Sequence, residues 1–394
     1  GAAAGPGRAQ RTGADDARRQ QWQLAALGAD AAWRHATGRG VTVAILDSGV
    51  DAGHPDLVGQ VLPGLDLVGA GDGRTDPVGH GTTVAGLIAG RRDDARGVVG
   101  LAPDAKILPV RVLDADNRYR DAAVVARGVR WAVDRGATVL NLSLGGAADS
   151  EVLAEALDYA FAHDVVVIAC TGNVHPGSAP AVWYPAREPG VVAVAGLDRT
   201  GADRLWRGSN TGPQTVLSAP ATGLVGARPG GYWRVQGTSF AAPLVTASAA
   251  LVRSRWPGMS AGNVVHRLLS TARDLGPPGR DPTYGFGAVD PAAALTADVP
   301  PVAGNPLDTA PPPGVTGFGP AAGAAEEAAP RRHGRSPVGG AEPAAGAGAQ
   351  PSAPPAAAPP APADRWSLVV GVLLFLALLG TGAVVTRRID RRGG

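Results

Sequence analysis

Cysteine is almost absent from this chain of 394 residues, because Cys170 is the only one. A single thiol cannot form an intrachain disulfide, and it cannot supply a zinc site built from several cysteines. Net charge is also small: a formal value of +2, with no basic stripe interleaved with aromatic residues, argues against nucleic acid as a partner. The sequence has no Gly-rich phosphate loop and no dense cluster of Asp and Glu. We therefore predict neither a cofactor nor a metal site.

What the chain does contain is enough apolar sequence for one large α/β domain with accessory segments, since 45% of its residues are hydrophobic. Residues 1–20 are rich in Ala, Gly and Arg, and we predict a flexible N-terminal arm there. From residue 21 the pattern changes. Apolar residues recur at helical spacing up to residue 33, which predicts a short amphipathic helix packed on a core.

Short apolar runs alternate with helical patterns from residue 41 onward. The runs are apolar on both faces, as strands are when both sides of their sheet are covered. They occupy residues 41–46, 107–112, 138–142, 165–169, 191–195 and 215–217, and helical patterns occupy 121–135, 151–163, 240–256 and 263–272. This order predicts an α/β domain over residues 21–296, with a doubly wound, mostly parallel sheet and helices on both faces.

The C-terminal part of the chain has a different character. Residues 297–366 are dominated by Pro, Ala and Gly, which predicts an extended linker. Residues 367–386 carry no charge, and a helix of that length spans roughly 30 Å, the thickness of a bilayer core. Arginines crowd the tail at 387–394. The positive-inside rule then predicts a single-pass protein of the cell membrane, with a cytoplasmic tail and an extracytoplasmic globular domain.

Three short motifs stand in order along the globular part: Asp-Ser-Gly at 47–49, His-Gly-Thr at 80–82 and Gly-Thr-Ser-Phe-Ala-Ala-Pro at 237–243. They supply an acid, a base and a nucleophile, each beside a predicted strand end or helix start. This is the residue set of a serine hydrolase, in one of the chain orders that such enzymes use.

Asp47 ends a buried apolar strand, where a carboxylate needs partners, and the imidazole of His80 is the partner that we expect. The alternative is an Asp that closes a turn, and Asp51 and Asp76 are rival acids in polar loops. His80 lies between glycines that leave its ring uncovered, which suits a general base. Its alternative role is that of a buried, hydrogen-bonded histidine.

Ser239 precedes a helix that is apolar all round and therefore buried. A hydroxyl at a helix N-terminus suits a nucleophile, although a plain N-cap serine would give the same pattern. Asn173 follows the strand at 165–169 and could donate its side-chain amide to an oxyanion, or it could be a turn residue in the left-handed region. Cys170 is interpreted as a small buried residue rather than a catalytic thiol.

The strand at 138–142 is followed by three residues that could contact a substrate, namely Ser143, Leu144 and Gly145. A glycine-containing strand end can accept an extended peptide by strand addition. An ordinary strand-to-helix loop would look the same in the sequence.

These motifs resemble those of the subtilisin-like serine proteases. The resemblance covers roughly residues 22–295 and includes the segments Asp-Ser-Gly-Val at 47–50 and His-Pro-Asp-Leu at 54–57. It implies the subtilisin-like fold, a triad of Asp47, His80 and Ser239, and Asn173 as oxyanion donor. It also implies that residues 143–145 line the substrate groove.

The layout of the whole chain resembles the mycosins, the membrane-anchored subtilases of type VII secretion systems in actinobacteria. The shared features are an N-terminal segment that wraps the catalytic domain, a Pro-rich stalk and one C-terminal span. The resemblance implies a protease that processes secreted substrates and supports the secretion complex in the membrane. Many mycosins carry paired cysteines, and the lone Cys170 cannot form those bridges.

Three functions follow as hypotheses. The leading one is a peptide-bond hydrolase acting on peptides or proteins. The second is a scaffold that holds a membrane secretion complex together with little proteolytic role, and the third is a general cell-surface subtilase.

Overall fold

A parallel sheet of seven strands forms the centre of the computed structural model, which describes residues 10–177, 179–200 and 203–308. The strand order is β3-β4-β2-β5-β6-β7-β8, and every neighbouring pair is parallel. The strands are β2 (Thr42–Asp47), β3 (Leu65–Asp66), β4 (Lys106–Arg111), β5 (Val139–Leu142), β6 (Val166–Cys170), β7 (Val192–Leu197) and β8 (Leu217–Pro220).

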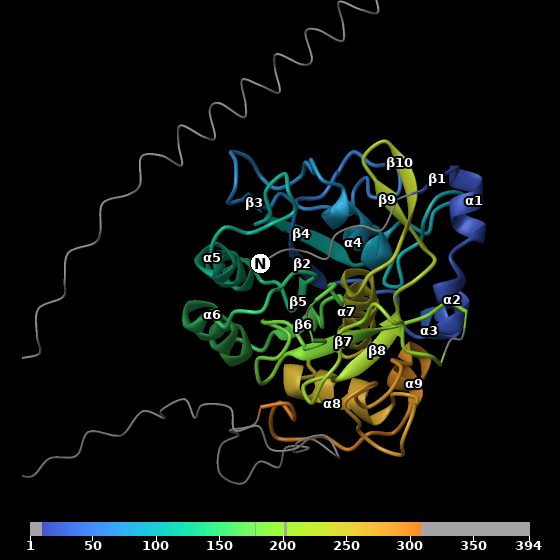
Figure 1. The fold of residues 1–394 in the computed structure, drawn as a ribbon. Coiled ribbons are helices and arrows are strands. Elements are labelled where there is room, and N and C mark those ends of the chain that lie inside the picture. The colour runs from blue at the N-terminus through green and yellow to red at the C-terminus, as the bar shows by residue number, and fades with distance from the viewer. Residues whose placement is uncertain (1–9, 178, 201–202, 309–394) are drawn as a thin grey trace, which may run out of the picture. The chain divides into compact units, whose positions relative to one another are not determined.

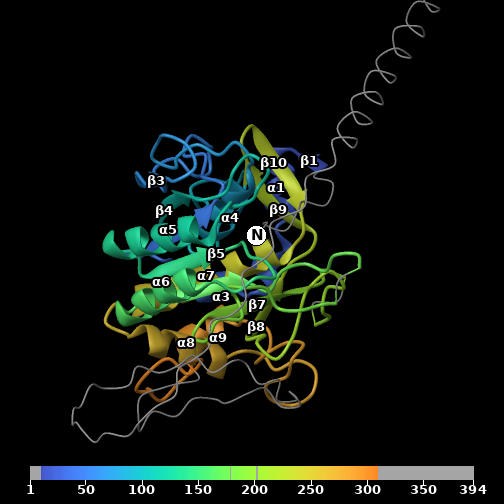
Figure 2. The ribbon, with the colours of Figure 1, turned by 60° about the vertical axis from the view of Figure 1, so that its left-hand side comes forward.

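Helices cover both faces of this sheet (Figures 1 and 2). On one face lie α5 (Ala122–Asp134) and α6 (Glu151–Ala162), and on the other lie α4 (His80–Ala89) and α7 (Thr238–Arg255). The predicted α/β fold with a parallel sheet is confirmed. Each predicted strand or helix starts within two residues of the observed one.

The central helix α7 owes its place to its sequence. It is rich in Ala, Val and Leu and carries no charge before Arg253, so no side of it prefers water. All residues from Thr238 to Arg253 are buried, and α7 packs against five strands of the sheet (β2, β5, β6, β7 and β8) and against α4. Its N-terminus is thereby fixed beside the carboxyl ends of β5 and β6.

A second, antiparallel sheet of three strands brings the N-terminal residues onto the domain. β1 (Gln10–Thr12) pairs with β10 (Gly231–Val235), which pairs with β9 (Leu224–Arg228). After β1, α1 (Ala14–Arg19) buries Ala17 completely, and the Arg18 guanidinium donates to three backbone carbonyls of residues 94–97. The prediction of a flexible arm is therefore wrong for residues 10–20. Their pairing partners lie far away in the sequence, so local composition could not reveal them.

The amphipathic pattern after residue 21 forms two helices instead of the single one predicted. They are α2 (Trp22–Ala26) and α3 (Ala29–Trp33), and Gly28 between them takes φ +61°, which ends the first helix. The Trp22 indole donates to the carbonyl of Thr222, and the Trp33 indole donates to that of Leu101. These hydrogen bonds hold the segment on the main domain.

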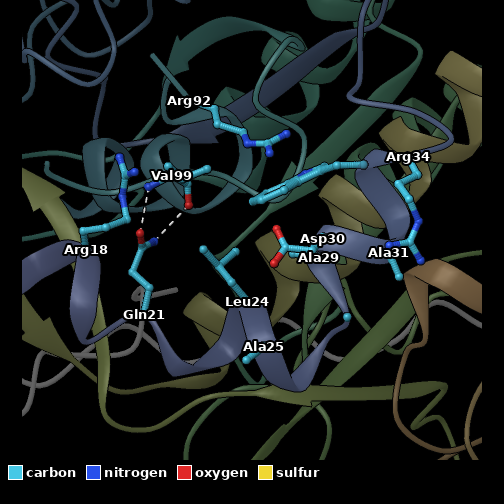
Figure 3. A pocket seen from close by; sticks show the side chains of 12 residues that line it. Arg18, Gln21, Leu24, Ala25, Ala29, Asp30, Ala31, Arg34, Arg92 and Val99 are labelled. Carbon is cyan, nitrogen blue, oxygen red and sulfur yellow. Dashed lines mark hydrogen bonds between the residues drawn. The ribbon is translucent and has the colours of Figure 1, made fainter. Parts of the chain in front are cut away.

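A cavity of about 660 Å³ lies between α2, α3 and residues 92–99 (Figure 3). The Gln21 amide bridges one wall to Val99 through two hydrogen bonds of 2.9 and 2.8 Å. From the same 92–99 segment, the Arg92 guanidinium stands 4.4 Å from the centre of the Trp33 ring. None of the residues predicted to carry the chemistry lines this cavity.

The folded chain continues beyond the predicted domain end at residue 296. α8 (Ala261–Ser270) and α9 (Pro291–Thr296) close the domain. The Asn263 side chain then exchanges two hydrogen bonds with the backbone of Val302, and Leu307 is buried. Residues 297–308 therefore pack on the domain.

The predictions for the rest of the linker up to residue 366, for the membrane span at 367–386 and for the tail at 387–394 lie outside the described residues. Among the helices that the structure does describe, none is both long and apolar enough to cross a membrane.

Candidate active site

Asp47 and His80 form a buried carboxylate–imidazole pair. Asp47 is the last residue of β2, and His80 is the first residue of α4. Nδ1 of His80 lies 2.8 Å from Oδ1 and 3.0 Å from Oδ2 of Asp47. Because a carboxylate only accepts, Nδ1 of the neutral ring carries the proton and Nε2 is left as an acceptor.

Nε2 of His80 is buried and has no hydrogen-bond partner within the part of the chain that the structure describes. An unpartnered buried acceptor costs about 1–3 kcal/mol, so such atoms call for a functional explanation. The His80 ring lies 5.2 Å, centre to centre, from the ring of Phe240, the residue after Ser239. The free nitrogen therefore belongs to a ring that packs against the first turn of α7.

Asp76 and Asp51, the rival acids, do not hydrogen-bond to the His80 ring. Oδ1 of Asp76 accepts from the Ser48 hydroxyl at 2.9 Å and from the two N–H groups before His80 at 3.0 and 2.7 Å. Its Oδ2 accepts from both the N–H and the hydroxyl of Thr82. Asp51 caps its own turn by accepting from the N–H of Gly53.

The start of α4 is thus capped from two loops. Gly79 is the N-cap residue, with φ +86°, and offers no side chain. Instead, Asp76 accepts from Thr82 N–H, and the Ser48 hydroxyl accepts from Gly81 N–H at 3.0 Å. These bonds satisfy N–H groups that a helix start leaves open, and they connect the residue after Asp47 with the residues on both sides of His80.

Gly81 is required by a close approach of two backbones. A Cβ at this position would lie 2.0 Å from the carbonyl oxygen of Gly49 and 3.2 Å from Oδ1 of Asp47. The end of β2 and the start of α4 can touch in this way only when residue 81 has no side chain.

Ser239 lies inside the first turn of α7 and is not its N-cap. The N-cap is Gly237, with φ +148°, and it offers no side chain of its own to the helix start. The alternative of a plain capping serine is therefore excluded. The Ser239 carbonyl accepts from the Ser143 hydroxyl at 2.7 Å, and its Oγ lies 3.9 Å from Sγ of Cys170.

Asn173 also holds the start of α7. Its Oδ1 accepts from the N–H and the hydroxyl of Thr238, at 3.1 and 2.9 Å. Since a backbone N–H can only donate, this pair of bonds fixes which side of the amide is oxygen. Nδ2 lies on the other side and makes no hydrogen bond among the described residues, so it is available as a donor. The positive φ of this turn belongs to Gly172 rather than to Asn173.

Cys170 is a packing residue beside the candidate nucleophile. Complete burial raises the pKa of its thiol to about 11, against the smaller effect of hydrogen bonds to Ser239 and Thr238. The group is therefore an uncharged thiol near neutral pH, as expected for a buried cysteine rather than a nucleophile.

Ser143, Leu144 and Gly145 follow β5 and are all buried. The Ser143 hydroxyl accepts from the Asn141 amide and donates to α7, so it faces the core. Beyond them, Gly146 pairs with Tyr184 through two backbone hydrogen bonds of 2.9 Å. Any contact that this run makes with a peptide would have to come from its backbone.

The sequence matches the model of the Subtilase family (Peptidase_S8) over residues 38–287, more than half of the chain. The chain belongs to the subtilase family. Members of this family are serine endopeptidases, and the motifs at residues 47, 80 and 239 all lie within the matched region.

Two relatives show how far the likeness extends. Subtilisin DY of Bacillus licheniformis is 37% identical over 241 residues, which cover 61% of this chain and 86% of that protein. Fervidolysin of Fervidobacterium pennivorans is 36% identical over 310 residues, 71% of this chain but only 44% of its own length. The present subtilase thus spans less than half of fervidolysin.

Solved structures of mycosins are also similar to this subtilase. The MycP3 protease from the type VII (ESX-3) secretion system is 34% identical, with a TM-score of 0.62, over 70% of this chain and 88% of that one. MycP1 from Mycobacterium smegmatis is 28% identical, with a TM-score of 0.66, over 76% and 90% of the respective chains. The mycosin-like character read from the sequence is confirmed.

Two residues near the site were not identified from the sequence. Arg228 of β9 donates to the carbonyls of the two residues before His80, and Trp183 packs beside Gly172. Neither stands in a recognisable motif. The sequence analysis gives Asp76 only the part of a rival acid, although an Asp shortly before a helix start is itself a capping signal.

Proposed function

We propose that this subtilase hydrolyses peptide bonds with Ser239 as nucleophile, His80 as general base and Asp47 as the group that orients the imidazole. Asn173 serves as an oxyanion donor. Peptides or proteins are the substrates, and no cofactor or metal takes part.

In this proposal Nε2 of His80 takes the proton of the Ser239 hydroxyl as Oγ attacks the carbonyl carbon. The carbonyl oxygen becomes an oxyanion and accepts from Nδ2 of Asn173. His80 then returns the proton to the leaving amine, and an acyl group remains on Ser239. A water molecule, activated by the same imidazole, releases the acid product and restores the hydroxyl.

One observation carries the proposal. The only free nitrogen of a buried, carboxylate-bound imidazole belongs to a ring that packs on the turn containing Ser239. A purely structural histidine would satisfy both ring nitrogens, because burying one unsatisfied is unfavourable.

Labelling of the full chain by a fluorophosphonate probe, followed by assay on a peptide library, tests this function. Wild-type protein should be labelled once, and Ser239→Ala should lose both labelling and peptide cleavage. Ser248→Ala is the matched control, since its hydroxyl lies on the same buried helix and donates to Leu244. Equal labelling of wild type and Ser239→Ala, or none of either, would refute the proposal.

We further propose a role in a type VII secretion system, supported by the mycosin neighbours and by the anchor-like run at 367–386. The protein would sit in the cell membrane with its catalytic domain outside and its tail in the cytoplasm. Deleting residues 367–386 should move it from the membrane fraction to the soluble fraction, whereas deleting a run of equal length from the linker should not.

The alternatives make different predictions in the producing cell. If processing and scaffolding are separate roles, Ser239→Ala stops substrate processing while secretion continues. A scaffold with little proteolytic role predicts no processing defect in that variant. A general cell-surface subtilase predicts broad peptide cleavage and no effect on secretion.

A further inference from the structure

The residues that follow two neighbouring strands hold the start of α7 by hydrogen bonds. After β5, the Ser143 hydroxyl donates to the Ser239 carbonyl, and after β6, Asn173 accepts from Thr238. On the function proposed above, the reacting carbonyl carbon sits at Ser239 and its oxygen at Asn173. The side chain of the residue that carries this carbonyl must then lie beside these two strand ends.

The segment around Trp183 already fills the space between the strand ends. The N–H of Trp183 donates to the carbonyl of Thr171 at 2.9 Å, and its neighbour Tyr184 pairs with Gly146. The segment therefore bridges from the chain that follows β6 to the chain that follows β5. It places the large indole side chain of Trp183 between the residues that follow β5 and those that follow β6.

The indole packs against a glycine on each side. A Cβ at Gly172 would lie 2.1 Å from Cδ2 of Trp183, and a Cβ at Gly145 would lie 3.2 Å from Cβ and 3.4 Å from Cε3. The ring of His175 stacks on the same indole at 5.6 Å between ring centres, with an angle of 8° between the planes. The indole is thus packed against three residues, Gly145, Gly172 and His175.

We propose that Trp183 determines specificity by restricting the residue before the cleaved bond to glycine, alanine or serine. With the space between the strand ends occupied by an indole, a side chain larger than a methyl or hydroxymethyl group would have to displace it. Packed interiors resist such insertion, because the surrounding side chains and backbone would have to shift.

The direct test compares peptide substrates that differ only in the residue before the cleaved bond, Ala against Phe, on the full chain. Wild type should cleave the Ala substrate with a kcat/KM at least about tenfold higher, as a change in pocket fit usually gives. Trp183→Ala should raise the Phe:Ala ratio of kcat/KM by roughly 10- to 100-fold. Trp131→Ala is the matched control, because Trp131 is a half-buried tryptophan on α5 and should leave the ratio unchanged.

Mapping the cleavage sites of wild-type protein on an unfolded protein substrate gives a second measurement that needs no variant. The proposal predicts small residues before most cuts. Frequent cuts after Leu, Phe or Tyr would overturn it, as would an unchanged ratio in a folded Trp183→Ala protein. In both cases fluorophosphonate labelling of Ser239 would persist, whereas failure of the proposed function would abolish labelling itself.

Discussion

The two sides of the candidate site are held in different ways. On the base side, around His80, directional hydrogen bonds fix nearly every polar atom, and Asp76 alone accepts five of them. On the nucleophile side, around Ser239, hydrogen bonds from Ser143 and Asn173 hold the helix start. The surface beside it is formed by close packing, with glycines at 145 and 172 against an indole and the Cys170 thiol against the hydroxyl. A base needs one ring orientation and one tautomer, which only directional bonds enforce. A surface that selects a substrate needs a shape, which packing provides.

The largest expected effect comes from replacing Asp47, the carboxylate that contacts His80 on the base side. Asp47→Asn keeps the shape of the side chain but can present an N–H to Nδ1 and favour the wrong tautomer. We expect kcat/KM to fall by about 10⁴, as is typical when a triad acid is neutralised, with little change in thermal unfolding. Asp51→Asn is the control, since an Asn can still accept from Gly53, and it should change kcat/KM by no more than about threefold. A comparable loss in both variants would contradict the assignment of Asp47.

The next test separates the two roles of Asn173. Asn173→Asp keeps an oxygen that can accept from Thr238 but removes the amide donor. We expect kcat to fall by ~10²–10³ or more, because one oxyanion donor is lost and a negative charge is added. Urea unfolding should change little. Asn173→Ala should lose activity and stability together. If both variants retained wild-type kcat, another group would have to stabilise the oxyanion.

Asp76→Asn should act mainly on stability, because Asp76 holds the loop and helix start rather than the ring. An amide has one acceptor oxygen, so it must turn its NH₂ toward the N–H groups on one side of the network. We expect a loss of about 2–3 kcal/mol in the free energy of unfolding, measured by urea titration, together with a lower kcat.

Asp72→Asn is the matched control for Asp76→Asn in the same loop. Asp72 forms a half-exposed ion pair with Arg74 at 2.7 Å. Surface pairs of this kind contribute about 0–1 kcal/mol. An equal loss of unfolding free energy in the two variants would show that the hydrogen bonds of Asp76 stabilise the protein no more than a surface ion pair does.

The smallest effect is expected on the nucleophile side at Cys170. Burial raises the pKa of this thiol to about 11, so the thiolate forms only as the pH rises toward that value. Iodoacetamide should therefore label native protein very slowly below about pH 9, and readily after unfolding in urea. Cys170→Ala should leave kcat/KM within about threefold of wild type, since the thiol acts by packing. Rapid alkylation at neutral pH would contradict this.

Local patterns in the sequence were sufficient to predict most strands of the parallel sheet and the helices that cover it. A strand buried on both faces, such as β6, reads as a continuous apolar run, and α7 reads as a helix without a polar side. The motif order at residues 47, 80 and 239 also identified the candidate chemistry. The N-terminal strand β1 could not be predicted, because its three residues have no recognisable pattern and form a strand only through pairing with β10.

For the site residues too, the sequence predicted the candidates, whereas the contacts between them came from the structure. The sequence indicated that Asp47, Asp51 or Asp76 could serve as the acid, but it could not rank them by distance to the ring. It also allowed Ser239 to be an N-cap and Asn173 to be a turn residue. The structure shows which carboxylate contacts the His80 ring and what holds the start of α7, through contacts between residues far apart in the chain, such as Asp47 with His80 and Asn173 with Thr238.

Which segments are buried, and which residue types stand at their ends, can be read from the order of residues, because periodicity and chain order are local properties. That Asp76 caps a helix and that Trp183 packs against two glycines follows from the three-dimensional arrangement alone. Those facts depend on which strand ends and loops meet in space, and the packing of the whole domain sets that arrangement.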